Sequence, residues 1–168
     1  EIIKLKNKKI YLSVPNFIGR EKYYLKDCID SQFVSSIGRY VRDFEKKISN
    51  FTKSKYAISC NSGTSALHLG LRVIGVKPDD EVIVPTMSFI ATANAVRYLG
   101  GSPIFMDCDN FFNLDVKKTI SFILKSTYFE NNFNYNKKTH KKISALIIVH
   151  VFGNAADIYP LLKICKNR

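Results

Sequence analysis

The sequence predicts an α/β fold in which a mostly parallel sheet is sandwiched by helices. From residue 56 onward, short and almost wholly apolar segments alternate with segments whose apolar residues recur at helical spacing. Apolar runs of this kind are typical of strands buried on both faces, with helices as the crossovers of a parallel sheet. The chain has 168 residues, 46% of them hydrophobic, which is enough for a buried core.

Four strands and four helices are expected in this alternating part. The strands are residues 56–60, 81–85, 102–109 and 144–152. The helices are residues 64–74, 88–99, 115–125 and 157–166. Gly75 and Gly100 end the first two helices, and Pro160 can occupy the first turn of the last one. The polar and aperiodic stretch 127–142 is expected to be a surface excursion between a helix and a strand.

The first 55 residues follow a different pattern. Apolar residues at helical spacing predict one helix within 20–34 and another within 40–52, with a serine-containing loop at 34–39 between them. We therefore expect an N-terminal helical segment over residues 1–55 and an α/β domain over residues 56–168. The last expected helix should lead into a further strand, which favours a longer protein.

Composition argues against several classes of function. The net charge is +12, but the basic residues are scattered in pairs and no nucleic-acid recognition motif accompanies them. The four cysteines form no CxxC pair, so no metal site is expected, and free thiols indicate a reducing, cytoplasmic compartment. No apolar run approaches the ~20 residues of a membrane span, and no signal peptide is recognised.

The stretch CNSGTSALHLGL, residues 60–71, leads from an expected strand through small hydroxyl residues directly into a helix. The free N–H groups of a first helical turn, together with the helix dipole, can bind an anion. Gly63 allows close approach, and Ser62, Thr64 and Ser65 carry hydroxyl donors. Serine and threonine are also ordinary N-caps, so the residues alone leave phosphate binding and plain capping both open. The stretch is neither a P-loop nor a dinucleotide-binding fingerprint.

Phe89 follows the polar turn after the expected strand 81–85, on the same side of the sheet as this phosphate-type corner. An aromatic residue there can fill the core or offer a flat face to a cofactor ring. Spacing does not separate the two interpretations.

Three stretches together resemble the sugar-nucleotide aminotransferases of the DegT/DnrJ/EryC1/StrS family, which are pyridoxal 5′-phosphate enzymes of fold type I. They are NSGTSALHLGL, DEVIVPTMSFIATANAVRYLGGSPIFMDCD and IIVHVFGNAADI, in the family's order, and the resemblance runs from about Ile10 to Cys165. It implies a truncated large domain of that fold over residues 56–168. The opening VPNFIGREKYYLKDCIDSQFVSSIGRYVRDFEKKI looks most like the legionaminic-acid-type branch.

The resemblance also implies roles for matching residues. The cofactor phosphate would be bound by Ser62, Gly63 and Thr64, and Phe89 would stack on the pyridine ring. The sugar nucleotide would be contacted by the loop residues Val34, Ser35 and Ser36, and by Thr86. His150 and Asp157 would belong to the wall of the site and the entry to the last helix, without a catalytic role.

Two residues that the chemistry of this family requires have no counterpart here. The Schiff-base lysine and the aspartate that pairs with the pyridine nitrogen are expected beyond Arg168, so this chain holds no catalytic residue. The resemblance implies the N-terminal part of a cytoplasmic homodimeric enzyme that moves an amino group, we expect from glutamate, to a nucleotide-linked 4-keto-6-deoxy sugar. Its products would serve cell-surface polysaccharide or nonulosonic sugar biosynthesis. The chain by itself is expected to be inactive.

Three alternatives stay open. One is a sugar dehydratase of the same superfamily that uses the pyridoxal or pyridoxamine form of the cofactor, with histidine in place of the lysine. The second is an inactive fragment of such an enzyme. The third, favoured only by the charge, is an unrelated protein that binds anions or nucleic acid.

Overall fold

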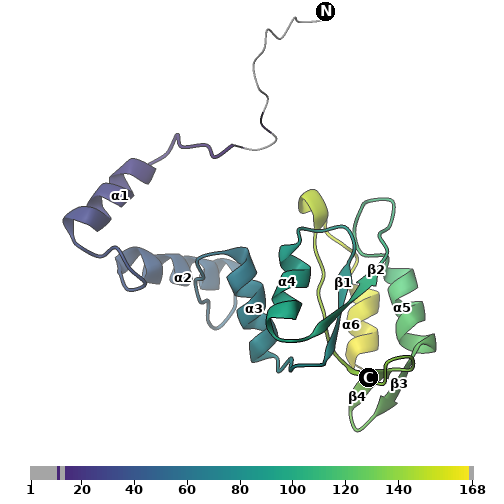
Figure 1. The fold of residues 1–168 in the computed structure, drawn as a ribbon. Helices are drawn as coiled ribbons and strands as arrows, with labels where there is room; N and C mark the ends of the chain where they lie inside the picture. Colours follow the sequence, from purple (N-terminus) through teal and green to yellow (C-terminus); the bar gives the residue numbers. More distant parts are fainter. Residues whose placement is uncertain (1–10, 12–13, 167–168) are drawn as a thin grey trace, which may run out of the picture. The chain divides into compact units, whose positions relative to one another are not determined.

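A computed structural model describes residue 11 and residues 14–166 of the chain. The chain divides into two compact units, Glu1–Ser59 and Cys60–Arg168. Figure 1 shows the helices and strands of both units. In the described part of the chain, no helix combines the length and the apolar character needed to cross a membrane.

Among its described residues, the first unit has two helices, α1 (Glu21–Asp30) and α2 (Arg39–Thr52), which confirms the two helices predicted from apolar spacing. A polar cluster fixes the turn between them. The Tyr40 hydroxyl donates to Asp27 at 2.8 Å, and the Arg39 guanidinium donates to the same carboxylate at 3.2 Å. None of the residues of α1 or α2 is buried, so these two helices do not form a hydrophobic core.

The second unit is built on a five-stranded sheet with the order β2-β1-β5-β4-β3. Its strands are β1 (Glu81–Pro85), β2 (Ser102–Met106), β3 (Thr127–Glu130), β4 (Phe133–Asn136) and β5 (Lys142–Leu146). β1 pairs in parallel with β2 and with β5, whereas β4 is antiparallel to both β3 and β5. The α/β class is confirmed, and the sheet is mixed because a hairpin extends its parallel part.

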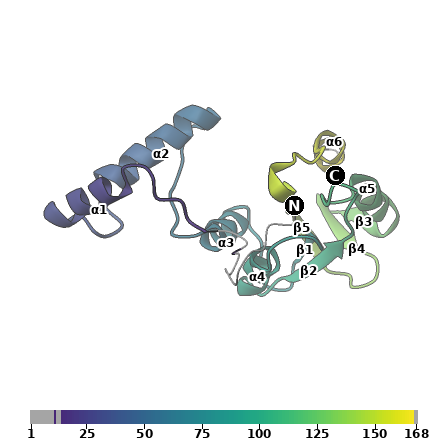
Figure 2. The ribbon, with the colours of Figure 1, turned by 90° about the horizontal axis from the view of Figure 1, so that it is seen from above.

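Helices cover both faces of this sheet, as Figure 2 shows from above. They are α3 (Gly63–Val73), α4 (Ala91–Tyr98), α5 (Val116–Lys125) and α6 (Tyr159–Lys166). Alternate side chains of β1 point to opposite faces. Val82 and Val84 therefore join the core beneath α3 and α4, and Ile83 joins a second core with Ile123 of α5 and Leu161 of α6.

The stretch 127–142, predicted to be a polar excursion, instead forms the β3–β4 hairpin and the start of β5. Buried contacts stabilise it although its sequence is polar. The Asn136 amide donates to Glu81 at 2.8 Å, and both side chains are buried. The Tyr128 and Tyr135 rings stack across the two strands. Cross-strand pairs of this kind stabilise a hairpin without an apolar run.

Three predicted strands differ from the structure, and the smallest difference is that the strand predicted over 102–109 ends at Met106. Residues 56–60 form no strand and pair with none of the described strands, and Tyr56 and Ile58 are each 74% exposed. The Ser59 N–H donates to the Glu45 side chain of α2 instead of a ladder partner. The strand predicted over 144–152 is β5, which spans Lys142–Leu146, and after an irregular stretch the chain enters the 3-10 segment Val151–Gly153.

Candidate functional site

The N-terminus of α3 is capped by Ser62. The backbone of Ser62 is extended, and its Oγ accepts a hydrogen bond from the Ser65 N–H at 3.2 Å. The hydroxyl groups of the two serines lie 3.0 Å apart. Ser62 therefore performs the capping role that its residue type favours.

Capping leaves other donors available at this end of α3. Gly63 and Thr64 are the first two residues of the helix, where N–H groups have no acceptor within the helix itself. A Cβ placed on Gly63 would meet no atom within 4 Å, so the space beside this turn is open. Two N–H groups, a threonine hydroxyl and the positive end of the helix dipole fit an anion of phosphate size.

Phe89 lies in the turn between β1 and α4, and its side chain is 89% exposed. It borders a cavity of about 320 Å³ that is lined by two segments, Met87–Phe89 and Val149–Phe152. Phe89 is therefore not a core residue, so of the two interpretations that the sequence left open, core filling does not apply. An exposed ring beside a mostly apolar cavity is suited to contact a planar ligand.

The Ser62–Thr64 corner and Phe89 belong to the same end of the same face. α3 and α4 pack side by side on the face formed by Val82 and Val84 (Figure 1). α3 precedes the start of β1 and α4 follows its end, so both helix N-termini lie toward the carboxyl end of that strand. The cavity beside Phe89 is lined by neither Ser62, Gly63 nor Thr64. In the described chain the two features share an edge of the sheet but not a cavity.

The second wall of the cavity is an unusual turn. Phe152 has φ +52° and ψ +24°, a left-handed conformation that is rare for a bulky residue, and Gly153 follows at φ +82°. His150 supports the turn, because its Nδ1 accepts the Ala156 N–H at 3.0 Å. Asp157 lies two residues before α6, and its Oδ1 accepts the Tyr159 N–H at 3.4 Å. His150 thus helps to shape the wall.

Sequence reasoning missed one residue that contacts this wall. The side-chain oxygen of Asn113 accepts a hydrogen bond from the buried Val151 N–H at 3.1 Å. Asn113 is 38 residues away in the sequence and only 3% exposed. No motif indicates this contact, and Asn110 in the same loop-like stretch makes Asn113 hard to single out from the sequence.

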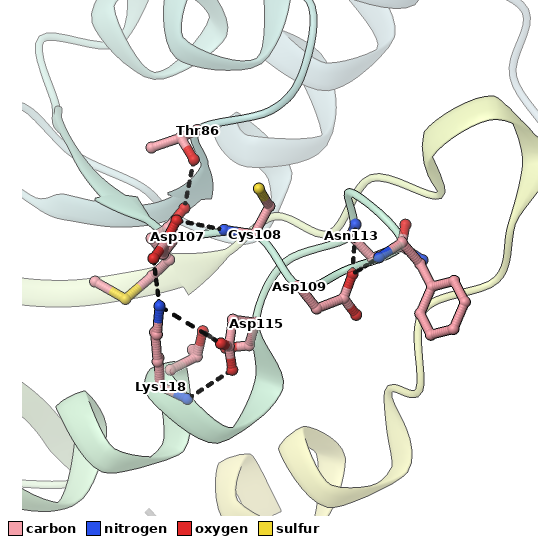
Figure 3. A network of polar contacts seen from close by, with 10 residues as sticks. Thr86, Asp107, Cys108, Asp109, Asn113, Asp115 and Lys118 are labelled. Carbon is pink, nitrogen blue, oxygen red and sulfur yellow. Dashed lines mark hydrogen bonds and ion pairs between the residues drawn. The ribbon is translucent and has the colours of Figure 1, made fainter.

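A polar network surrounds the end of β2 (Figure 3). Lys118 of α5 forms an ion pair with Asp107, and the Cys108 N–H donates to the same carboxyl at 2.9 Å. These two donors, the lysine first, hold the pKa of Asp107 below its usual range. The hydrogen bond to Asp107 in turn raises the pKa of Lys118. The Thr86 hydroxyl donates to the Met106 carbonyl at 3.1 Å, so it is held at the end of β2.

The predicted substrate loop lies in the first unit. Val34 and Ser35 line a cavity of about 490 Å³ between α1 and α2, and Ser36 does not line it. All three residues are exposed. Their loop can therefore offer backbone and hydroxyl groups to a ligand. Among the described residues, no group of three or more His, Cys, Asp or Glu side chains could hold a metal ion.

Comparison with known proteins gives a consistent result. The DegT/DnrJ/EryC1/StrS aminotransferase family matches residues 16–168. The chain is 36% identical over 160 residues to a GDP-perosamine synthase of Caulobacter vibrioides, covering 95% of this chain and 39% of that protein. It is 35% identical over 154 residues to a GDP-perosamine synthase of Escherichia coli O157:H7, covering 92% of this chain and 38% of that protein. The chain thus spans less than two fifths of the length of these relatives.

Solved structures agree on the fold. A DegT DnrJ EryC1 StrS aminotransferase from Brucella abortus superposes with a TM-score of 0.74 at 27% identity, covering 87% of this chain and 37% of that one. An aminotransferase from Psychrobacter cryohalolentis superposes with a TM-score of 0.75 at 26% identity, covering 91% and 35%. The match over residues 16–168, the relatives and the common fold lead to one conclusion: the chain belongs to the DegT/DnrJ/EryC1/StrS aminotransferase family.

Proposed function

We propose that the chain is the N-terminal part of a pyridoxal 5′-phosphate-dependent aminotransferase that acts on a nucleotide-linked 4-keto-6-deoxy sugar. Family membership supports the reaction class. The names of relatives support the substrate class, since three are GDP-perosamine synthases and another is named a spore coat polysaccharide biosynthesis protein. The products would be used in polysaccharide biosynthesis. The legionaminic-type branch stays a prediction, because the relatives reported above carry other names.

The residues at the two candidate features fit the cofactor. The N–H groups of Gly63 and Thr64, with the hydroxyls of Ser62 and Thr64, would hold the phosphate. Phe89 would lie against the ring, and the cavity of about 320 Å³ beside it is within the usual size range of ligand pockets. When bound, the cofactor supplies an electron sink for bond breaking at the amino carbon.

The proposed role of this chain's own residues is therefore to bind and orient the cofactor and the sugar nucleotide. The α3 corner would hold the phosphate end of the cofactor, and Phe89 with the Val149–Phe152 wall would contact its ring. Val34, Ser35, Ser36 and Thr86 would contact the sugar nucleotide. None of these groups is suited to form the covalent bond to the cofactor. We propose that the 168-residue chain alone does not transfer amino groups, and turnover of glutamate by the purified chain would contradict this.

The proposal also includes the compartment, the oligomeric state, the roles of the two segments and the amino donor. We propose a cytoplasmic enzyme that works as a homodimer, with residues 1–55 as the helical segment carrying the substrate loop and residues 56–168 as part of the cofactor-binding domain. Glutamate is the proposed amino donor. Sizing of the full-length protein tests the oligomeric state.

The observation that carries the proposal is the open α3 N-terminus, with free N–H groups at Gly63 and Thr64 in a chain of this family. The test is calorimetric titration of the purified chain with pyridoxamine 5′-phosphate. We expect saturable binding that Thr64→Val weakens by removing one hydroxyl without changing shape. Phe89→Leu should weaken it by about two- to tenfold, the range typical of lost aromatic stacking.

Phe111→Leu is the matched control, because Phe111 is 71% exposed in the same unit and lies outside the cavity. It should bind like the wild type. Absence of binding to the wild-type chain, or equal loss in the Phe89 and Phe111 variants, would overturn the proposal.

A further inference from the structure

Asn113 connects the loop that follows β2 with the Val149–Phe152 wall of the cavity. Its amide oxygen accepts the Val151 N–H at 3.1 Å, and both residues are buried. One segment follows β2, and the other is the wall of the cavity beside Phe89. A buried N–H without an acceptor is unfavourable, so this contact favours one position of the wall.

The backbone of Asn113, which carries the side-chain amide that contacts Val151, is itself held in place (Figure 3). The Asp109 carboxylate accepts the N–H groups of Phe111 and Asn113 at 2.8 and 3.0 Å. The Asp109 N–H donates to the Asn113 carbonyl at 2.8 Å. These bonds close the loop 109–113 on itself, and a closed loop loses little freedom when it binds the wall.

The wall needs such support because its own backbone is strained. Phe152, directly after Val151, is in the left-handed region, and its side chain is 85% exposed and packs on little. Strained backbone of this kind persists where the surroundings over-determine it. The hydrogen bonds from Val151 to Asn113 and from Ala156 to His150 are two contacts that can do so.

We propose that Asn113 is a positioning residue that sets the distance between the Val149–Phe152 wall and Phe89, and so the space open to the cofactor ring. It acts through the Val151 backbone and does not itself line the cavity. The proposal rests on the proposed function, because the ring is the group that this space would receive. The α3 corner does not depend on it.

The first arm of the test is amide hydrogen exchange in the free chain, which needs no ligand. Asn113→Leu has a similar size but no acceptor, whereas Asn113→Asp keeps an oxygen at the same position. Exchange at Val151 is compared with exchange at Val84, which lies in the central strand β1 and reports global opening. Asn113→Leu should accelerate amide exchange at Val151 at least tenfold more than exchange at Val84, which is the effect expected of one lost buried hydrogen bond. Asn113→Asp should restore most of the protection.

The second arm is titration with pyridoxamine 5′-phosphate and, separately, with inorganic phosphate. Asn113→Leu should weaken binding of pyridoxamine 5′-phosphate about tenfold and leave binding of inorganic phosphate unchanged, because only the ring would contact the wall. Asn110→Leu is the control, since Asn110 is exposed in the same loop. It should match the wild type in both arms.

The outcomes separate the two proposals. If Val151 and Val84 accelerate equally in Asn113→Leu, or if the ring-bearing ligand binds that variant as it binds the wild type, the positioning role is wrong while the proposed function stands. If the wild type binds no pyridoxamine 5′-phosphate, the proposed function fails, and with it the claim about the ring. The exchange data then still decide whether Asn113 holds the wall.

Discussion

The Oγ of Ser62 accepts the Ser65 N–H at 3.2 Å, and this one contact explains how the α3 N-terminus can serve two purposes. The cap uses the N–H of the third helical residue and leaves the N–H groups of Gly63 and Thr64 free. Capping and anion binding therefore draw on different donors. The α3 N-terminus can therefore be capped by Ser62 and still offer N–H groups to an anion, so the two interpretations of the sequence do not exclude each other.

Ser62 substitutions should separate the two purposes. Ser62→Ala removes the cap and should lower the free energy of unfolding by about 1 kcal/mol, measured by urea denaturation. Ser62→Asp keeps a capping oxygen but adds a negative charge beside the free N–H groups. It should preserve stability and weaken binding of pyridoxamine 5′-phosphate. If Ser62→Asp binds this ligand as well as the wild type does, no phosphate lies at this corner.

The ion pair between Asp107 and Lys118 should give stability a defined pH dependence. The pKa of Asp107 is lowered in the folded state, chiefly by the Lys118 hydrogen bond. A carboxyl with a lowered pKa contributes stability that is present above its unfolded pKa and lost as the pH falls through its folded pKa. The difference in stability between the wild type and Lys118→Met should therefore be full at neutral pH and vanish in acid.

NMR titration of the Asp107 carboxyl tests the cause directly. In Lys118→Met the pKa of Asp107 should rise toward its ordinary value. Lys117→Met removes the neighbouring positive charge but not the ion-pair partner, and it should leave the Asp107 pKa close to that of the wild type. An equal rise in both variants would mean that general charge, and not the Lys118 contact, lowers the pKa.

Sequence reasoning predicted best where one local rule decides the structure. The segment 81–85 is β1 in the structure with the same bounds, because a strand buried on both faces is mostly apolar, as its residues Val82–Val84 are. α5 begins at Val116, directly after Asp115, whose side chain caps the helix by accepting the Lys118 N–H at 2.9 Å. Such signals lie within a few residues of the feature that they predict.

Features that depend on distant partners were missed. The β3–β4 hairpin has a polar sequence, and its anchor is the contact between Asn136 and Glu81, 55 residues apart. Residues 56–60 have the composition of a strand but no partner among the described strands, and composition cannot supply one. At the candidate site, the residue types at Ser62 and Phe89 were informative, whereas the role of Asn113 depends on where Val151 lies in space.

The buried carboxylate of Glu81 should stabilise the hairpin. Its two oxygens accept the Asn136 amide at 2.8 Å and the Thr139 hydroxyl at 2.9 Å. Glu81→Leu leaves the Asn136 donor buried without this acceptor, and should lower the free energy of unfolding by about 1.5–3 kcal/mol, as for hydrogen bonds to charged groups. Glu81→Gln keeps one oxygen for Asn136, and the Thr139 hydroxyl can rotate to accept, so it should cost less.

A double-mutant cycle in urea checks this account. If the contact is direct, Glu81→Leu combined with Asn136→Leu should cost less than the sum of the single changes, with a coupling of about 0.5–3 kcal/mol. Strict additivity would show that the hairpin is held by other contacts.

Two glycines offer a matched comparison between backbone strain and steric contact. Gly75 after α3 and Gly100 after α4 both have positive φ, +89° and +76°. Both end their helices with the same hydrogen bonds, since the next residue donates to Leu71 or Val96. They differ in their surroundings. A Cβ on Gly75 would meet no atom within 4 Å, whereas a Cβ on Gly100 would lie 3.2 Å from the Cβ of Pro78.

Gly75→Ala should therefore lower the free energy of unfolding by about 1–2 kcal/mol, the cost of a left-handed conformation for a residue with a Cβ. Gly100→Ala carries the same cost and, in addition, an overpacking term of about 1–3 kcal/mol, because the Pro78 ring must move. Urea denaturation of the two variants measures both, and their difference isolates the contact with Pro78. Equal destabilisation would show that the chain around Pro78 yields freely, and a larger loss in Gly75→Ala would contradict the open surroundings of that turn.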